Sequence, residues 1–222
     1  MIGPNEKNLT PRECEMTLNG KPFRFLNQRS QDWTHLYEYE GSGATMTDAA
    51  CGIFSICHAA EYLTGILQDP EALCDFSAAN GGRCEDGTDR PALIKAMAEA
   101  GLDAVYGFSC GHEGNINDRE ALWTCLKNGG AALCNLRVGH IVALCGARED
   151  EHGERQALVI DSLGESSDAR VRNAVREILP ESEIKYLLYN KQKLLTGYGE
   201  SYAMFWVTLD ACMNFDLLEK RY

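Results

Sequence analysis

Hydrophobic and polar positions divide the chain into a helical first part and a strand-rich second part. In residues 47–65, "TDAACGIFSICHAAEYLTG", apolar residues recur at helical spacing. Thr47 or Asp48 can cap this helix, and Gly65 lies near its end. Three further segments are expected to be helical: 70–79, 89–100 and 118–128.

After residue 130, short runs rich in apolar and β-branched residues predict strands. Two of them, "HIVALCGA" (140–147) and "QALVIDSL" (156–163), flank a polar turn and predict an antiparallel hairpin. Other strands are expected at 14–18, 21–28, 131–138 and 202–209, and late helices at 168–179 and 184–195. Helices first and an antiparallel sheet second predict an α+β domain of two facing halves, with a site in the cleft between them.

Length and charge narrow the class of protein. The 222 residues are 45% hydrophobic and show no internal repeat, which predicts one domain with a substantial core. Because 33 acidic residues outnumber 21 Lys and Arg, the net charge is −12, and we expect neither a nucleic-acid nor a membrane partner. Residues 1–20 do not resemble a secretory signal, and no apolar run could span a bilayer, so we expect a cytoplasmic protein.

The ten cysteines are expected to be mostly thiols, because the cytoplasm is reducing. They form no CxxC pair, so a structural zinc site is not expected. Most of them fit the role of small buried hydrophobes. A cysteine that carries out chemistry would have to differ from these in its surroundings.

Three residues together suggest a catalytic thiol. Cys51 falls in the first turn of its helix, where the helix dipole favours a thiolate, and Gly52 beside it is expected to leave room for a substrate backbone. His140 begins a strand, and Asp161 ends the strand expected to pair with it, so the hairpin should make them neighbours. Such a carboxylate would orient the imidazole. Taken alone, His140 could equally be a core histidine, and Asp161 could simply start a turn.

An oxyanion hole would complete an acyl-transfer site. The backbone N–H of Cys51 is one candidate donor, and the side-chain amide of Gln28 or of Gln31 is another. As polar loop residues, neither glutamine would stand out without the other three positions.

Other motifs favour plainer interpretations. His58 and Glu61 lie at helical spacing but lack an evident third metal ligand, so we expect a polar helix face, with His58 facing solvent, and no metal site. The Cys110–His112 pair has no evident orienting residue. The segment "YEGSGATMTD" lacks the Lys of a phosphate-binding loop, so no nucleotide cofactor is expected.

The segments "LNQRSQDW", "ACGIFSICHAAEYLTG", "GHIVALCG" and "LVIDSLG" resemble the papain-like cysteine peptidases, especially the bacteriocin-leader-processing (double-glycine leader) peptidase-like family of bacteria. The segments "EDGTDRPALIKAMAEAGL" and "EALWTCLKNGGAAL" match the same family. The resemblance spans about residues 22–165 and implies a single papain-like domain, 1–222. Residues 166–200 would then be a helical elaboration, and 201–222 a late strand and tail.

The resemblance implies that Cys51 is the nucleophile, His140 the general base and acid, Asp161 the orienting residue and Gln28 the oxyanion donor, with no cofactor. Many members have Gly at position 50, Pro soon after the cysteine and Pro after the aspartate; this chain has Ala50, then Ile53 and Phe54, and Ser162. These departures remove no reacting atom, but they leave the subfamily and the substrate open.

The expected function is therefore hydrolysis of a peptide or isopeptide bond in a peptide or protein substrate. The same residues would serve a glutamine deamidase or an acyl transferase. A catalytically silent peptide-binding module and a structural domain with only buried cysteines are the alternatives from other classes.

Overall fold

A computed structural model describes residues 12–28, 30–85, 87–89, 91–109, 116–136, 139–163, 203–209 and 214–221. The helices are α1 (Met46–Ala49), α2 (Cys51–Thr64), α3 (Pro70–Ala79), α4 (Leu93–Glu99) and α5 (Ile116–Lys127). The early strands are β1 (Glu13–Leu18), β2 (Lys21–Leu26), β3 (Arg83–Cys84), β4 (Gly87–Thr88) and β5 (Leu102–Ser109). The later strands are β6 (Ala131–Leu136), β7 (His140–Glu149), β8 (Arg155–Asp161), β9 (Ala203–Thr208) and β10 (Asn214–Lys220).

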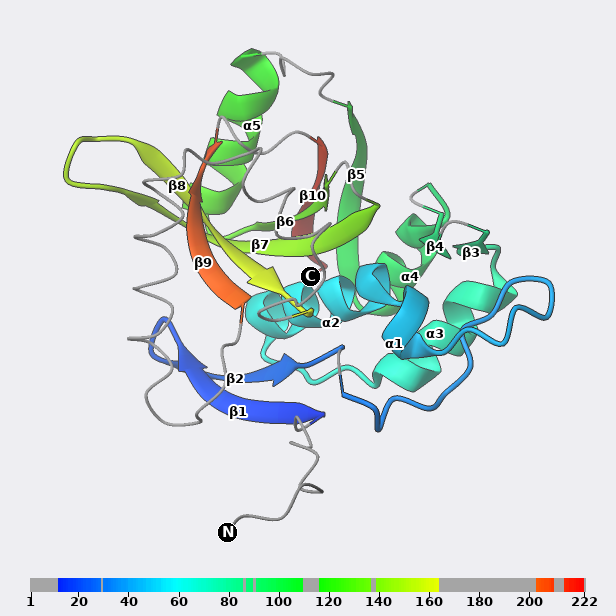
Figure 1. Ribbon diagram of the computed structural model, residues 1–222. Coiled ribbons are helices and arrows are strands. Elements are labelled where there is room, and N and C mark those ends of the chain that lie inside the picture. The colour runs from blue at the N-terminus through cyan, green and yellow to red at the C-terminus, as the bar shows by residue number, and fades with distance from the viewer. Residues whose placement is uncertain are drawn as a thin grey trace, which may run out of the picture.

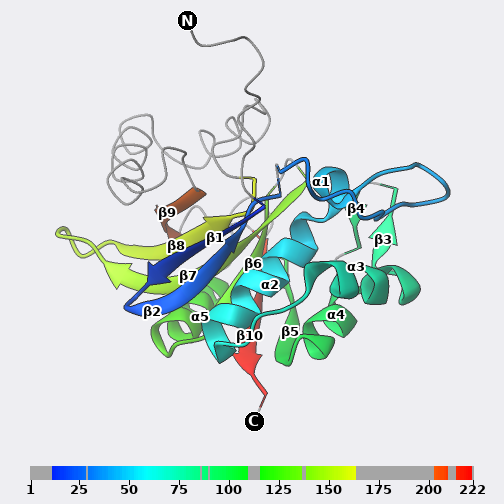
Figure 2. The same cartoon turned by 90° about the horizontal axis from the view of Figure 1, so that it is seen from below.

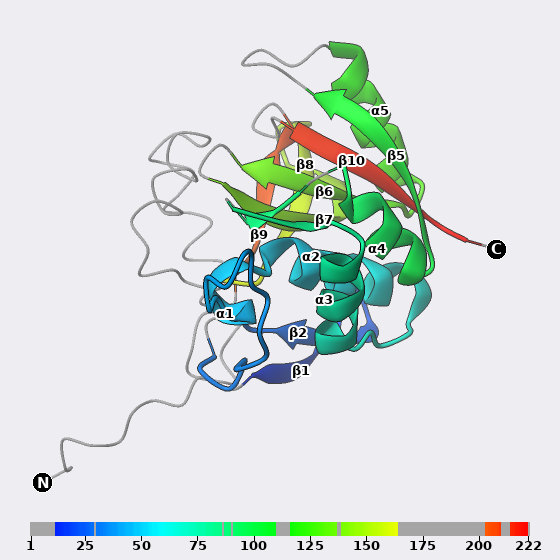
Figure 3. The ribbon, with the colours of Figure 1, turned by 90° about the vertical axis from the view of Figure 1, so that its right-hand side faces the viewer.

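A six-stranded antiparallel sheet forms the centre of the fold, in the order β5-β10-β6-β7-β8-β9. Helix α5 covers one face of this sheet and α2 the other (Figure 1). The separate β1–β2 hairpin lies beyond α2, as the side view shows (Figure 3). Seen from below, α2 and the β1–β2 hairpin both lie in front of the large sheet (Figure 2). The protein is thus an α+β protein, as its sequence predicts.

Helix α2 is buried along most of its length. Residues 51–61 are all buried, because the large sheet lies on one side of the helix and β2 contacts another. The helix carries three polar side chains in this stretch, and two of them bond to the outer edge of β2. The Leu26 N–H donates to His58 Nε2 at 2.9 Å, and the Arg24 N–H donates to Glu61 Oε1 at 2.6 Å. No strand of the described residues lies along this edge of β2, and the two side chains therefore satisfy its N–H groups.

His58 is consequently not at the surface, where the sequence placed it. Its ring is fully buried and stacks on Phe25, with ring centroids 5.3 Å apart. Burial lowers the pKa of His58 to about 3, so the imidazole is neutral and can accept the Leu26 N–H. The expected polar helix face at His58 and Glu61 is wrong, because β2 covers that side of α2.

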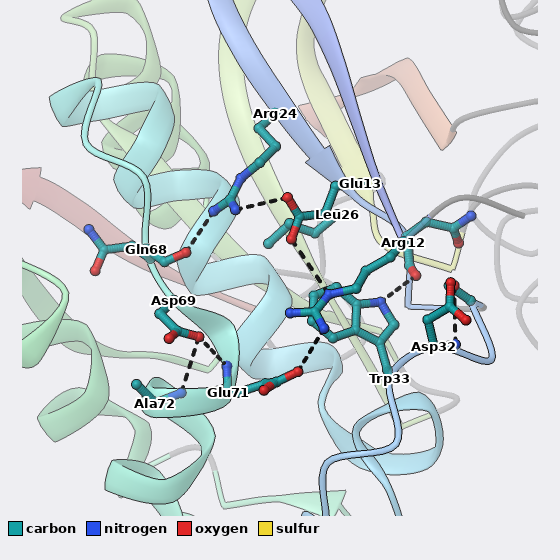
Figure 4. Close-up of polar contacts among 12 residues, drawn as sticks. Arg12, Glu13, Arg24, Leu26, Asp32, Trp33, Gln68, Asp69, Glu71 and Ala72 are labelled. Carbon is teal, nitrogen blue, oxygen red and sulfur yellow. Dashed lines mark hydrogen bonds and ion pairs between the residues drawn. The ribbon is translucent and has the colours of Figure 1, made fainter.

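The turn after β2 is held by a second group of contacts (Figure 4). The Arg12 guanidinium lies over the Trp33 ring, 3.7 Å from its centroid, and pairs with Glu71 of α3 at 2.8 Å. The Trp33 indole N–H donates to the carbonyl of Asn27 at 2.8 Å. Because Asn27 precedes Gln28, these contacts fix the backbone at that residue.

Most of the predicted elements are confirmed, with differences at helix starts and in the sheet. The hairpin of β7 and β8 and the late strand β9 are present as expected. Strands β5 and β10 were not expected; β10 occupies residues predicted to be a tail and lies between β5 and β6. The helices expected at 168–179 and 184–195, in the elaboration at 166–200, lie outside the described residues. None of the helices in the described part of the chain is long and apolar enough to cross a membrane.

Replacing His58 by Ala should destabilise the protein by about 2–4 kcal/mol, because it leaves the Leu26 N–H without an acceptor and a cavity beside Phe25. Urea unfolding measures this change. The matched control is His152→Ala, in the exposed turn between β7 and β8, which should leave the unfolding midpoint unchanged. Equal midpoints for the two variants would show that His58 does not support β2.

Candidate active site

Cys51 is the first residue of α2, directly after a break between two helices. Thr45 and Asp48 cap the short helix α1 with a capping box, in which the Thr45 N–H donates to Asp48 Oδ2 at 2.8 Å. The cap predicted at Thr47 or Asp48 for the helix of Cys51 is therefore wrong, because both residues lie in the separate helix α1, which precedes α2. Ala50, at the N-cap of α2, provides no side-chain hydrogen bond. The N–H of Gly52, in this first turn, contributes to the lowered pKa of the Cys51 thiol.

His140 and Asp161 are brought together by the β7–β8 hairpin, as predicted. Ala143 pairs with Ile160, a register that places Asp161 diagonally across from His140 on one face of the ladder. His140 Nε2 lies 2.7 Å from Asp161 Oδ1, and both side chains are at least 95% buried. The Leu163 N–H donates to the same Oδ1 at 2.9 Å, which holds the carboxylate in place.

The Cys51 thiol lies near the His140 ring, and each of the two groups shifts the pKa of the other. Since Nε2 of the ring faces Asp161, Nδ1 is the nitrogen left for the thiol. The side chains therefore follow the order Cys51, His140, Asp161 in space, from the start of α2, the start of β7 and the end of β8.

The charges of this group favour a thiolate and an imidazolium. Burial raises the pKa of the Cys51 thiol, but the hydrogen bond and charge of His140, with the N–H groups of Ile141 and Gly52, bring it below the ordinary value. Burial lowers the pKa of His140, yet Asp161 and Cys51 more than offset this and raise it to about 10. The ion pair thus spans the interval between the lowered thiol pKa and about pH 10.

The pKa values of other thiols are shifted upward, in the opposite direction to that of Cys51. Burial raises the pKa of Cys57, Cys74 and Cys145 far above the usual range, and it raises that of Cys125 to about 11. Among the described cysteines with a shifted pKa, Cys51 is the one that is lowered. The Cys110–His112 pair lies outside the described residues.

Gln28 lies beside the site, and Gln31 is exposed in the next turn. The Gln28 side-chain amide donates to the Thr47 carbonyl at 3.1 Å and to the Met46 carbonyl at 3.4 Å. Its Oε1 accepts the Ser162 hydroxyl at 2.9 Å. Gln28 therefore joins the segment before α2 to the end of β8. The sequence offered no sign of Ser162 as its partner, apart from its place next to Asp161.

Gly52 has a different role from the one expected. A Cβ at this position would lie 3.0 Å from Leu93 Cδ1 and 3.3 Å from both Ile141 Cδ1 and Thr88 Cβ. The glycine therefore permits α2 to approach the protein's own α4, β4 and β7. It does not leave space for a substrate backbone.

The other described histidines are engaged elsewhere. His35 pairs with Asp75 at 2.8 Å at the surface, and His152 lies in the exposed hairpin turn. Among the described residues, no group of three or more His, Cys, Asp or Glu side chains could hold a metal ion.

No family model matches the chain, and no curated protein matches its sequence. The chemistry of the site is therefore inferred from its residues and their geometry.

Replacing Asp161 by Asn should lower the pKa of His140 from about 10, because the variant removes the charge that raises it and keeps an oxygen acceptor. The titration of His140, followed by NMR of its ring nitrogens, measures the change. Asp75→Asn, which removes the carboxylate paired with His35, should leave the His140 midpoint unchanged. A His140 midpoint that is the same in both variants would contradict the electrostatic role of Asp161.

Proposed function

We propose that the protein is a thiol hydrolase of the papain-like cysteine peptidase type, which cleaves a peptide or isopeptide bond. The observation that carries this proposal is the buried contact of His140 with Asp161, at 2.7 Å, next to a thiol whose pKa is lowered by the same histidine. A nucleophile, a base in contact with it and a residue that orients the base form the arrangement that acyl transfer requires.

In the proposed reaction, the Cys51 thiolate attacks the substrate carbonyl carbon, and the carbonyl oxygen becomes an oxyanion. The Cys51 N–H, in the uncapped first turn of α2, is the first candidate to stabilise that charge. The His140 imidazolium then donates its proton to the leaving amine, so that the C–N bond breaks and a thioester remains. Neutral His140 removes a proton from water, which attacks the thioester and releases the acid.

Gln28 is the proposed second oxyanion donor. Its amide hydrogens point to the Met46 and Thr47 carbonyls, so it can serve the oxyanion only by giving up one of these bonds. Breaking the bond to the Met46 carbonyl costs little free energy, because at 3.4 Å it is a long and weak hydrogen bond. The Ser162 hydroxyl keeps the amide oxygen turned away from those carbonyls.

The pH dependence of alkylation of each cysteine, read by peptide mass spectrometry, tests the ion pair without a substrate. Cys51 should react well below the pH at which an ordinary thiol does, near pKa 8.5, and His140→Ala should abolish this advantage. Cys125 is the internal control, because its raised pKa of about 11 should be the same in both proteins. Alkylation of Cys51 like a free thiol in the wild type would refute the proposed function.

The products formed from protein and peptide substrates separate hydrolysis from its chemical rival. A peptidase creates new amino and carboxyl termini, whereas a glutamine deamidase converts Gln to Glu and leaves the chain uncut. We expect cleavage, with a loss of at least about 10³-fold in Cys51→Ser. The control is Cys84→Ser, a half-buried thiol on β3, which should retain activity. Conversion of Gln to Glu without cleavage would favour the deamidase.

A further inference from the structure

Ser55, on α2, makes a buried hydrogen bond to the strand that carries His140. Its side chain is fully buried, and its hydroxyl donates to the carbonyl of Ile141 on β7 at 2.9 Å. The proposed chemistry does not use this serine. The contact joins two segments that lie far apart in the chain. Of the three buried polar side chains of α2, Ser55 is the one that bonds to the large sheet, whereas His58 and Glu61 bond to β2.

This bond lies beside the catalytic group. Cys51 and Ser55 are four residues apart on α2 and so share one face of the helix. Ile141 directly follows His140, and its N–H contributes to the lowered pKa of the Cys51 thiol. The residue that Ser55 holds through its carbonyl is therefore also next to the thiol.

The apolar contacts around this bond set the distance between α2 and β7, but they do not fix the position of α2 along the strand. Gly52 brings α2 against β7 so closely that a Cβ would lie 3.3 Å from Ile141 Cδ1. Apolar contacts of this kind are non-directional, whereas a hydrogen bond depends steeply on distance and angle. The Ser55 hydroxyl is therefore the contact that restricts sliding of α2 along β7 at this point.

We propose that Ser55 is a positioning residue, which fixes the register of α2 against β7 and so keeps the Cys51 thiol beside His140. This inference rests on the proposed function for its catalytic meaning. A small slide of the helix would move the thiol away from His140 and from the Ile141 N–H. These groups would then no longer offset the effect of burial on the thiol pKa, and the thiolate would be lost.

The test compares Ser55→Ala with Ser77→Ala. Ser77 is a matched control, because it is also a buried serine on a helix, and its hydroxyl bonds Tyr37 at 3.0 Å away from the triad. Two quantities are measured in each folded protein: the alkylation rate of Cys51 against pH, and the hydrogen exchange of the Ile141 amide. Ser55→Thr, which retains a hydroxyl, is the conservative variant.

Ser55→Ala should slow alkylation of Cys51 at pH 6 roughly tenfold, equivalent to about one pKa unit, and should speed exchange at Ile141. Ser77→Ala should lose stability but change neither quantity, and Ser55→Thr should restore both toward wild type. If Ser55→Ala and Ser77→Ala behave alike in both measurements, Ser55 is only a structural residue and the inference is wrong.

Failure of the proposed function gives a different result. In that case Cys51 of the wild type alkylates like a free thiol, whatever residue stands at position 55. The exchange of the Ile141 amide still decides whether Ser55 holds β7. Unchanged exchange in Ser55→Ala would overturn the inference in that case also.

Discussion

The burial of α2 is the constraint on which the rest of the structure depends. A polar side chain on a helix enclosed by a six-stranded sheet and a hairpin is destabilising unless it finds a hydrogen-bond partner. Its three polar residues in the buried stretch bond to strand backbones, Ser55 to β7, and His58 and Glu61 to β2. Directional bonds on two sides therefore fix the helix between both layers, which apolar packing alone would not do.

The grouping of Cys51, His140 and Asp161 follows from this constraint and from one local unit, the β7–β8 hairpin. The β7–β8 hairpin sets His140 against Asp161 through its register, with little help from the rest of the chain. The start of α2 supplies Cys51, and the contacts of α2 with β7 bring the two parts together. The position of Cys51 relative to His140 is thus set by how α2 packs on β7.

The sequence predicted what depends on neighbours along the chain and missed what depends on distant ones. The hairpin and its His140–Asp161 contact follow from alternation and a short turn. The surroundings of His58 depend on β2, and β10 becomes a strand because it fits between β5 and β6. The apolar run around α2 does signal burial on all sides, a pattern that would have argued against an exposed His58.

Burial alone cannot select a reactive thiol, because it acts on Cys51 in the same direction as on Cys57 and Cys145. All three lie in the core, and in all three the loss of water disfavours the thiolate. The difference is that Cys51 stands at a helix start, where His140 and the N–H groups of Ile141 and Gly52 lower the pKa of its thiol. For Cys57, in the middle of the same helix, the charge of Arg24 and its own N–H do not offset the effect of burial. A shift of Cys51 by one turn along α2 would therefore remove the groups that lower its pKa without changing its burial.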